Sequence, residues 1–317
     1  MQNRKTEKPS NPLDGIPIPA PGSLTYNGYL KVNELILLQE CLSDPAHHDE
    51  PLFIIIHQTY ELWFKLILHE MDTILEMMAA GRARKATFYM KRVIAIMKLL
   101  VQQIHILETM TPRDFLGFRY ALSPASGFGS SQFREIELLT GLRSQELVDR
   151  FKTEEAHERL MKRFEGPSLG ESFYKMLRSK GFDLPEGREG MSDSELEQLQ
   201  EKRIRELLRI YNDDEEYGEL LDLAESLVEF DEQMYFWRAH HMTVVERMIG
   251  SKRGTGGSDG VTYLQSTLTK RSFPDLWRLR AYLQRPEGAA DETCPAAGSS
   301  KPEGSQPTSG CPFHSSY

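Results

Sequence analysis

His241 is the side chain with the clearest chemical potential, because it interrupts an apolar stripe on a helix predicted over residues 215–249. Apolar residues recur there at steps of three and four, a spacing that places them on one helical face. A neutral imidazole among them needs a partner, since burying its ring nitrogens unpaired costs about 1–3 kcal/mol. Two interpretations follow: a core histidine bonded to a backbone carbonyl, or an axial ligand to a buried metal or haem. The neighbouring His240 points about 100° away around the helix and is expected at its boundary or surface.

His57 is a second histidine in an apolar stripe, on a helix predicted over residues 52–80. It lies four residues after Phe53 and three before Tyr60, so it shares their face. Two such histidines on separate long helices strengthen the metal or haem interpretation. No carboxylates accompany them at the spacing of a di-iron site, and the zinc-protease motif is absent.

Arg119 ends a short aromatic helix predicted after Thr111-Pro112, immediately before the Gly- and Ser-rich loop 123–131. Its planar guanidinium could bind a carboxylate through paired hydrogen bonds, or it could hold a local turn.

The segment GSKRGTGGSDG, residues 250–260, is rich in glycine but lacks the Gly-Lys-Ser/Thr ending of a P-loop. It is either a helix end followed by the next helix start, or a flexible cover over a pocket. In the second case the Thr255 hydroxyl could meet a polar ligand group.

The elements that position these residues are all predicted to be helical, so we expect an all-α fold. Helices 52–80 and 84–108, joined by a short turn, should form an antiparallel pair. We expect one folded domain over residues 23–285, which also includes helices 29–42, 215–249, 261–269 and 275–283. Within it, residues 132–214 should form three or four helices, and the charge-rich residues 141–214 an outer subdomain. Residues 1–22 are interpreted as a flexible arm and residues 286–317 as a disordered tail.

The net charge of −9 over 317 residues argues against a nucleic-acid partner. No apolar run approaches the roughly 20 residues needed to span a bilayer, and the polar, Pro-rich start does not look like a secretory signal. The three cysteines, Cys41, Cys294 and Cys311, are too few and too unevenly placed for a disulfide framework. A reducing cytoplasm is therefore expected.

Four stretches of the chain resemble the tryptophan 2,3-dioxygenase family: LTYNGYLKV (24–32), HDEPLFIIIHQTYELWFKLILHE (48–70), LETMTPRDFLGFRYALSPASGFGSSQFREIE (107–137) and FWRAHHMTVVERMIGSKRGTGGSDGVTYL (236–264). The resemblance implies a multi-helix, haem-binding bundle. It also implies an enzyme that inserts both atoms of O₂ across the indole C2–C3 bond of L-tryptophan. The product would be N-formyl-L-kynurenine, in the first step of tryptophan catabolism, and the assembly a homotetramer built as a dimer of dimers.

The resemblance also assigns roles to the residues discussed above. His241 matches the axial ligand of the haem b iron, with one haem per subunit. His57 matches the histidine beside the substrate indole N–H, Arg119 the clamp on the substrate carboxylate, and Thr255 the residue that meets the carboxylate and the ammonium group.

Other matched positions surround the substrate and the haem. Phe53, Phe115 and Ser126 match pocket-lining positions, and Ser126-Gly127 matches the loop near the haem edge. Tyr26 and Tyr29 match an N-terminal segment that reaches into a neighbouring subunit's site. Two alternatives stay open at this point: a haem monooxygenase acting on a substituted tryptophan or another aromatic amino acid, and a non-catalytic haem sensor or carrier.

Overall fold

The computed structural model describes residues 22–187, 190–254 and 260–284, and every regular element in these ranges is a helix. The predicted all-α class is therefore confirmed. Residues 1–21, Thr255 and the predicted tail lie outside the described ranges.

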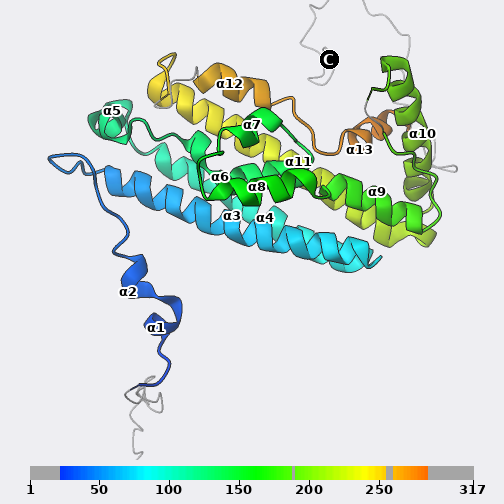
Figure 1. Cartoon of the computed structure of the whole chain (residues 1–317), viewed down its shortest axis with the longest axis horizontal. Coiled ribbons are helices and arrows are strands. Elements are labelled where there is room, and N and C mark those ends of the chain that lie inside the picture. Colours follow the sequence, from blue (N-terminus) through cyan, green and yellow to red (C-terminus); the bar gives the residue numbers. More distant parts are fainter. Residues whose placement is uncertain (1–21, 188–189, 255–259, 285–317) are drawn as a thin grey trace, which may run out of the picture.

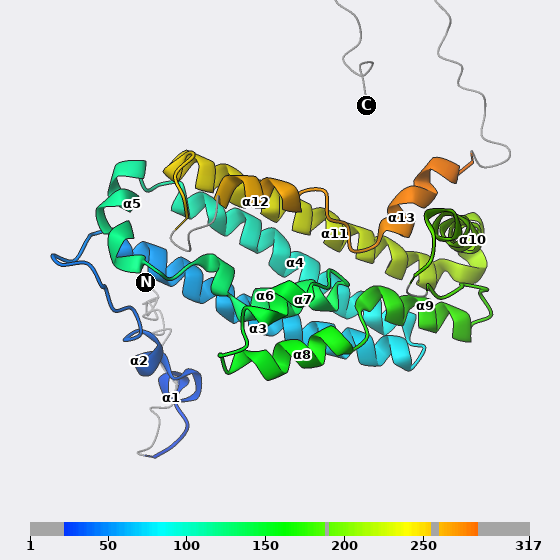
Figure 2. The same ribbon diagram turned by 45° about the horizontal axis from the view of Figure 1, so that its top comes forward.

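Three long helices form the body of the molecule (Figures 1 and 2): α3 (Glu50–Ala79), α4 (Ala83–Leu107) and α11 (Asp214–Ile249). α4 packs against both of the others. α3 and α4 form the predicted antiparallel pair, and the turn between them contains Gly81 at φ +70°, a conformation that glycine adopts without a steric penalty.

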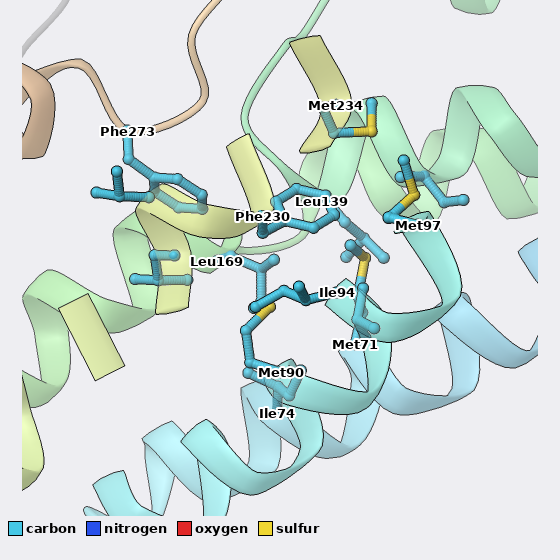
Figure 3. Close-up of a cluster of buried hydrophobic side chains, with 14 of the residues drawn as sticks. Met71, Ile74, Met90, Ile94, Met97, Leu139, Leu169, Phe230, Met234 and Phe273 are labelled. Carbon is cyan, nitrogen blue, oxygen red and sulfur yellow. The ribbon is translucent and has the colours of Figure 1, made fainter. Parts of the chain in front are cut away.

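The core lies between these three helices and is mainly apolar (Figure 3). Each large side chain removed from water there contributes about 1.5–3 kcal/mol. The cluster drawn in Figure 3 combines residues of α3, α4, α6, α9 and α11 with Phe273: Met71, Ile74, Met90, Ile94, Met97, Leu139, Leu169, Phe230 and Met234. All of them are buried. The predicted stripes on the long helices therefore face one another.

The charged middle of the chain folds as α6 (Ser131–Leu139), α7 (Gln145–Asp149), α8 (Ala156–Glu165), α9 (Leu169–Ser179) and α10 (Asp193–Asn212). Its apolar residues divide between two clusters. Those of α9 and α10 join the main core, whereas those of α7 and α8 form a smaller cluster with Leu138. The separate outer subdomain over residues 141–214 stays a prediction.

The prediction of a single helix over residues 29–42 is wrong. The structure has two short helices, α1 (Tyr26–Leu30) and α2 (Val32–Leu35), separated by Lys31 at φ +53°, and no helix over 36–42. This segment extends away from the bundle (Figure 1). Its apolar side chains, such as Leu37 at 74% exposure, pack on no core in the single chain. Short helices need such packing to be stable.

The short helices at the two ends of the bundle complete the fold. α5 (Pro112–Phe118) begins at the predicted N-cap Thr111, which forms a capping box with Asp114, and continues as the 3₁₀ helix η1 (Arg119–Leu122). A second 3₁₀ turn, η2 (Gly127–Gly129), precedes α6. The chain closes with α12 (Gly260–Thr267), α13 (Pro274–Arg278) and η3 (Leu279–Tyr282).

Among the described residues, no single helix has the length and apolarity to cross a membrane. One pair of helices, Ala83–Leu107 with Pro112–Leu122, meets both criteria only when taken together, and it is bent by 89°. α4 is a core helix of the bundle, and its apolar face is already covered by α3 and α11.

Candidate functional site

The start of α3, α5 and the last turns of α11, which carry the candidate residues, lie at one end of the bundle (Figure 2). Four segments meet there: the start of α3, α5 with η1, the loop 123–130, and the last turns of α11. Long-range folding thus joins residues that are far apart in the sequence.

An aromatic wall forms where α5 faces the start of α3. The Phe53 ring lies 4.0 Å from the His57 ring and 5.7 Å from the Phe115 ring, centroid to centroid. Phe118 is the third phenylalanine of this cluster and is fully buried. Its ring centroid lies 5.7 Å from that of Phe53 and 5.5 Å from that of Phe115. Flat apolar rings in this arrangement suit a planar aromatic ligand.

His57 lies beside this wall, and its side chain is exposed, while Ile56 and Tyr60 next to it are buried. The predicted burial of His57 in the stripe is therefore wrong: it sits at the edge of the apolar face. Its Nδ1 is 2.7 Å from the Phe53 carbonyl oxygen. Because a carbonyl only accepts, Nδ1 carries the hydrogen and Nε2 keeps its lone pair. Nearby protein excludes water from the His57 ring, which lowers its pKa. The hydrogen bond to the Phe53 carbonyl and the charge of Glu61 raise the pKa by a smaller amount.

His241 lies on the last third of α11, with its ring 5.2 Å from that of Trp237, which in turn packs 4.7 Å from Phe133. Its Nδ1 is buried and neither donates nor accepts a hydrogen bond with any described residue. The interpretation of a core histidine bonded to a carbonyl is therefore not met at this nitrogen. Burial, followed by the charges of His57 and Arg134, lowers the pKa of His241 to about 4, so the imidazole is neutral.

A neutral imidazole with an unpaired buried nitrogen and aromatic neighbours fits the axial ligand of a haem. The described residues contain no group of three or more His, Cys, Asp or Glu side chains that could hold a bare metal ion. A single histidine suffices only for a metal that brings most of its own ligands, as a porphyrin does.

Arg119 follows the last residue of α5, and its Nη2 donates a hydrogen bond to the Arg253 carbonyl oxygen. The contact ties α5 to the segment after α11, two residues before Thr255. The guanidinium carries five N–H donors, and one such bond leaves the others for a ligand carboxylate. This bond joins distant segments and does not hold a local turn, and the role of Arg119 as a carboxylate clamp stays a prediction.

The loop that contains Ser126 and Gly127 is held by local contacts. The Ser126 hydroxyl accepts a hydrogen bond from the Phe128 N–H at 3.3 Å, which starts the 3₁₀ turn. The Phe128 ring centroid lies 4.3 Å from the guanidinium carbon of Arg134 and 4.9 Å from that of Arg150, within cation–π distance of both. A cavity of about 930 Å³ lies behind the loop, and Ser126, Phe128, Glu137 and Arg150 are among its lining residues.

Tyr26 and Tyr29 are not brought to this site within one chain. Both lie on α1, away from the bundle (Figure 1), and are 76% and 72% exposed.

Sequence reasoning missed several residues at this end of the bundle. Phe118 and Trp237 were not singled out, although both contact predicted site residues. A buried charge cluster of Arg134, Glu137 and Arg238 was not anticipated at all. The only signal for it was an Arg and a Glu three residues apart on a predicted helix.

A family model described as tryptophan 2,3-dioxygenase matches residues 19–183 and 197–283. Curated relatives named tryptophan 2,3-dioxygenase are similar over most of their length. The protein of Herpetosiphon aurantiacus is 42% identical over 261 residues, which cover 82% of this chain and 99% of that protein. The protein of Nocardioides sp. is 45% identical over 266 residues, with 82% and 95% covered. The protein of Caulobacter vibrioides is 43% identical over 262 residues, with 82% and 98% covered. The chain therefore belongs to the tryptophan 2,3-dioxygenase family.

Proposed function

We propose that this chain is a haem-dependent dioxygenase that converts L-tryptophan and O₂ into N-formyl-L-kynurenine, the first step of tryptophan catabolism. The indole C2–C3 bond breaks, and each of the two carbons receives one oxygen atom from O₂. The observation that carries the proposal is the meeting of His241, with its unpaired nitrogen, and the Phe53–His57–Phe115 wall at one end of the bundle. The family membership supports it.

In this proposal His241 holds the iron of one haem b per subunit, and Ser126 and Gly127 lie at the haem edge. Its low pKa supports this role, because only the neutral imidazole can donate a lone pair to a metal. When bound, the haem supplies the redox chemistry that allows O₂ to react with a closed-shell indole.

His57 orients the substrate indole. Since Nδ1 is engaged by the Phe53 carbonyl, Nε2 is free to accept a hydrogen bond from the indole N–H. Phe53 and Phe115 pack on the indole ring and keep water away from it. The ring is thus held in one orientation.

Arg119 and Thr255 bind the amino-acid part of the substrate. Arg119 pairs with the carboxylate through its fork of N–H donors, and Thr255 meets the carboxylate and the ammonium group. The two ends of L-tryptophan are then fixed at once, so the reacting carbons are presented in a single position.

The assembly we propose is a homotetramer, a dimer of dimers, in which Tyr26 and Tyr29 complete the site of a neighbouring subunit. The high exposure of both rings and of Leu37 supports it, because apolar side chains exposed together mark an interaction surface. The proposed location is the cytoplasm, with no nucleic-acid or membrane partner.

The test is a single-turnover experiment. Ferrous protein is mixed with L-tryptophan under anaerobic conditions, and O₂ labelled with ¹⁸O is then added. The proposal predicts N-formyl-L-kynurenine near one equivalent, with both labelled atoms in the product. A product with one labelled oxygen, or stable O₂ binding without turnover, would contradict it. His57→Ala should keep its haem and turn over more slowly.

A further inference from the structure

Glu137 of α6 is a buried carboxylate shared by two buried arginines. Its Oε2 lies 2.5 Å from Arg134 Nη1 and its Oε1 lies 3.5 Å from Arg238 Nη2. The three side chains are 4%, 6% and 3% exposed, so water screens none of these charges. Glu137 carries the negative charge between the two guanidinium groups. It is hydrogen-bonded to Arg134, whereas its contact with Arg238 Nη2 is an ion pair without a hydrogen bond, and Asp231 also attracts Arg238.

The first guanidinium holds the loop at the proposed haem edge. Arg134 Nε donates to the Phe128 carbonyl oxygen at 3.5 Å, and its guanidinium plane covers the Phe128 ring at 4.3 Å. Phe128 follows Ser126 by two residues and bonds to its hydroxyl through the backbone N–H. A displacement of Arg134 therefore moves Ser126 and Gly127.

The second guanidinium holds the helix that carries the proposed haem ligand. Arg238 precedes His241 by one turn of α11, and its Nη1 donates to the Lys270 carbonyl oxygen at 3.4 Å. Beside Arg238 in the sequence, Trp237 packs on Phe133 of α6 and on His241. Phe133 and Glu137 are one turn apart on α6, so this helix holds the turn before His241 at two points.

We propose that Glu137 is a positioning residue of this enzyme, which sets the loop through Arg134 and the His241 turn through Arg238. Glu137 couples the two sides of the site, so a change at one carboxylate alters both. This inference rests on the proposed function for its kinetic consequences, while its structural consequence can be measured without haem or tryptophan.

The same helix offers a matched control in Glu135. Its side chain is 5% exposed, against 4% for Glu137, and it also pairs with two arginines, Arg159 at 3.1 Å and Arg163 at 3.3 Å. Those arginines belong to α8. Arg163 Nη2 also donates a hydrogen bond to Asp72 on α3, away from the site. Glu135→Gln and Glu137→Gln therefore remove the same charge from two similarly buried carboxylates of one helix. The arginines of Glu135 are more exposed, at 55% and 20%, and they contact Asp72 and the Ser131 hydroxyl instead of Phe128 and Lys270.

The experiment measures hydrogen–deuterium exchange of the haem-free full chain, wild type and both variants, over residues 123–130 and 237–244. We expect Glu137→Gln to exchange faster than wild type in both segments, and Glu135→Gln to match wild type in both. Equal exchange in the two variants, or no change in Glu137→Gln, would overturn the proposal. Neither result depends on catalysis.

The haem-loaded enzyme gives the second readout. We expect Glu137→Gln to release haem to apomyoglobin about tenfold faster and to raise the KM for L-tryptophan about tenfold, whereas Glu135→Gln lowers only the melting temperature. A wild type that binds no haem would reject the proposed function and leave the exchange result standing. A Glu137→Gln protein with wild-type haem release and KM would reject the positioning role.

If Glu137→Gln does not fold, two further variants test the Arg134 contacts and the Arg238 contacts separately. Arg134→Lys keeps the charge but loses the planar stack on Phe128, so only residues 123–130 should exchange faster. Arg238→Lys should affect only residues 237–244. The proposal would be overturned if exchange rose in neither variant. It would also be overturned if each variant raised exchange equally in residues 123–130 and 237–244.

Discussion

The middle of the bundle and the end that carries the candidate site differ in how their side chains are satisfied. In the middle (Figure 3), Met71, Ile74 and Phe230 are fully buried among other apolar groups. At the site end, Phe53 and Phe115 are only half-buried, and His241 has a buried nitrogen without a partner. The first region supplies stability and the second supplies chemistry. Mutations should therefore separate the two properties by region.

The largest effect on stability is expected in the middle. Phe230→Ala should lower the free energy of unfolding by about 3–5 kcal/mol, because the cavity cannot collapse inside a closely packed core. Phe115→Ala should cost about 1 kcal/mol and instead raise the KM for L-tryptophan. Urea unfolding of the haem-free proteins measures both. Equal losses in the two variants would break the distinction between the regions.

The next largest effect is a loss of activity without a loss of stability, and it is expected only at the site end. Arg119→Lys should lower kcat/KM for L-tryptophan about 100-fold, close to 2.7 kcal/mol, since an ammonium group cannot form the paired contact with a carboxylate. Its stability should stay near that of wild type. Arg113→Lys is the control, because Arg113 lies on the same helix and is exposed. A loss of activity that the control shares would remove Arg119 from substrate binding.

A smaller effect depends on pH and concerns Glu50, a buried carboxylate at the start of α3. Burial raises the pKa of Glu50, but hydrogen bonds from the Ser43 hydroxyl and from the backbone N–H groups of Leu42 and Ser43 bring it below its usual value. Because the folded pKa is the lower one, its contribution to stability is complete above the unfolded pKa. The contribution is lost as pH falls through the folded pKa.

Glu50→Gln should therefore cost about 2 kcal/mol at pH 7, with a difference from wild type that shrinks below about pH 4.3. Thermal unfolding across pH measures this difference. Asp49→Asn is the control, since the Asp49 side chain makes no capping hydrogen bond. A Glu50→Gln deficit that stays constant down to pH 3 would show that charge is not its cause.

The three long helices and the cap of α5 could be predicted from the sequence because each depends on local information. Stripes with helical spacing bury the same faces that the periodicity predicts, as with Leu223, Leu227 and Phe230 on α11. Thr111-Pro112 starts α5 because the cap forms within four residues. The prediction of a helix over 29–42 was wrong because nothing in one chain covers the apolar side chains of this segment. The spacing of apolar residues does not show whether such a cover exists.

The site was predictable only as separate residues. His57, Phe53, Phe115 and His241 came from the stripes and from the family resemblance, and the fold brings them to one end. Their environment could not be read from spacing, which placed His57 in the core although it is exposed. The shared carboxylate of Glu137 depends on contacts between α6 and α11, which are far apart in the sequence. Thr255 lies outside the described residues, so its role stays a prediction.

The most direct test of the central claim is a hemin titration of the haem-free full chain, with His241→Ala and His240→Ala beside the wild type. His240 is the matched control, because its Nδ1 is already bonded to the Phe236 carbonyl oxygen. We predict a Soret band that saturates at one hemin per chain for wild type and His240→Ala, and no saturable band for His241→Ala. Stoichiometric, tight binding by His241→Ala, or a wild type that stays colourless, would contradict the account.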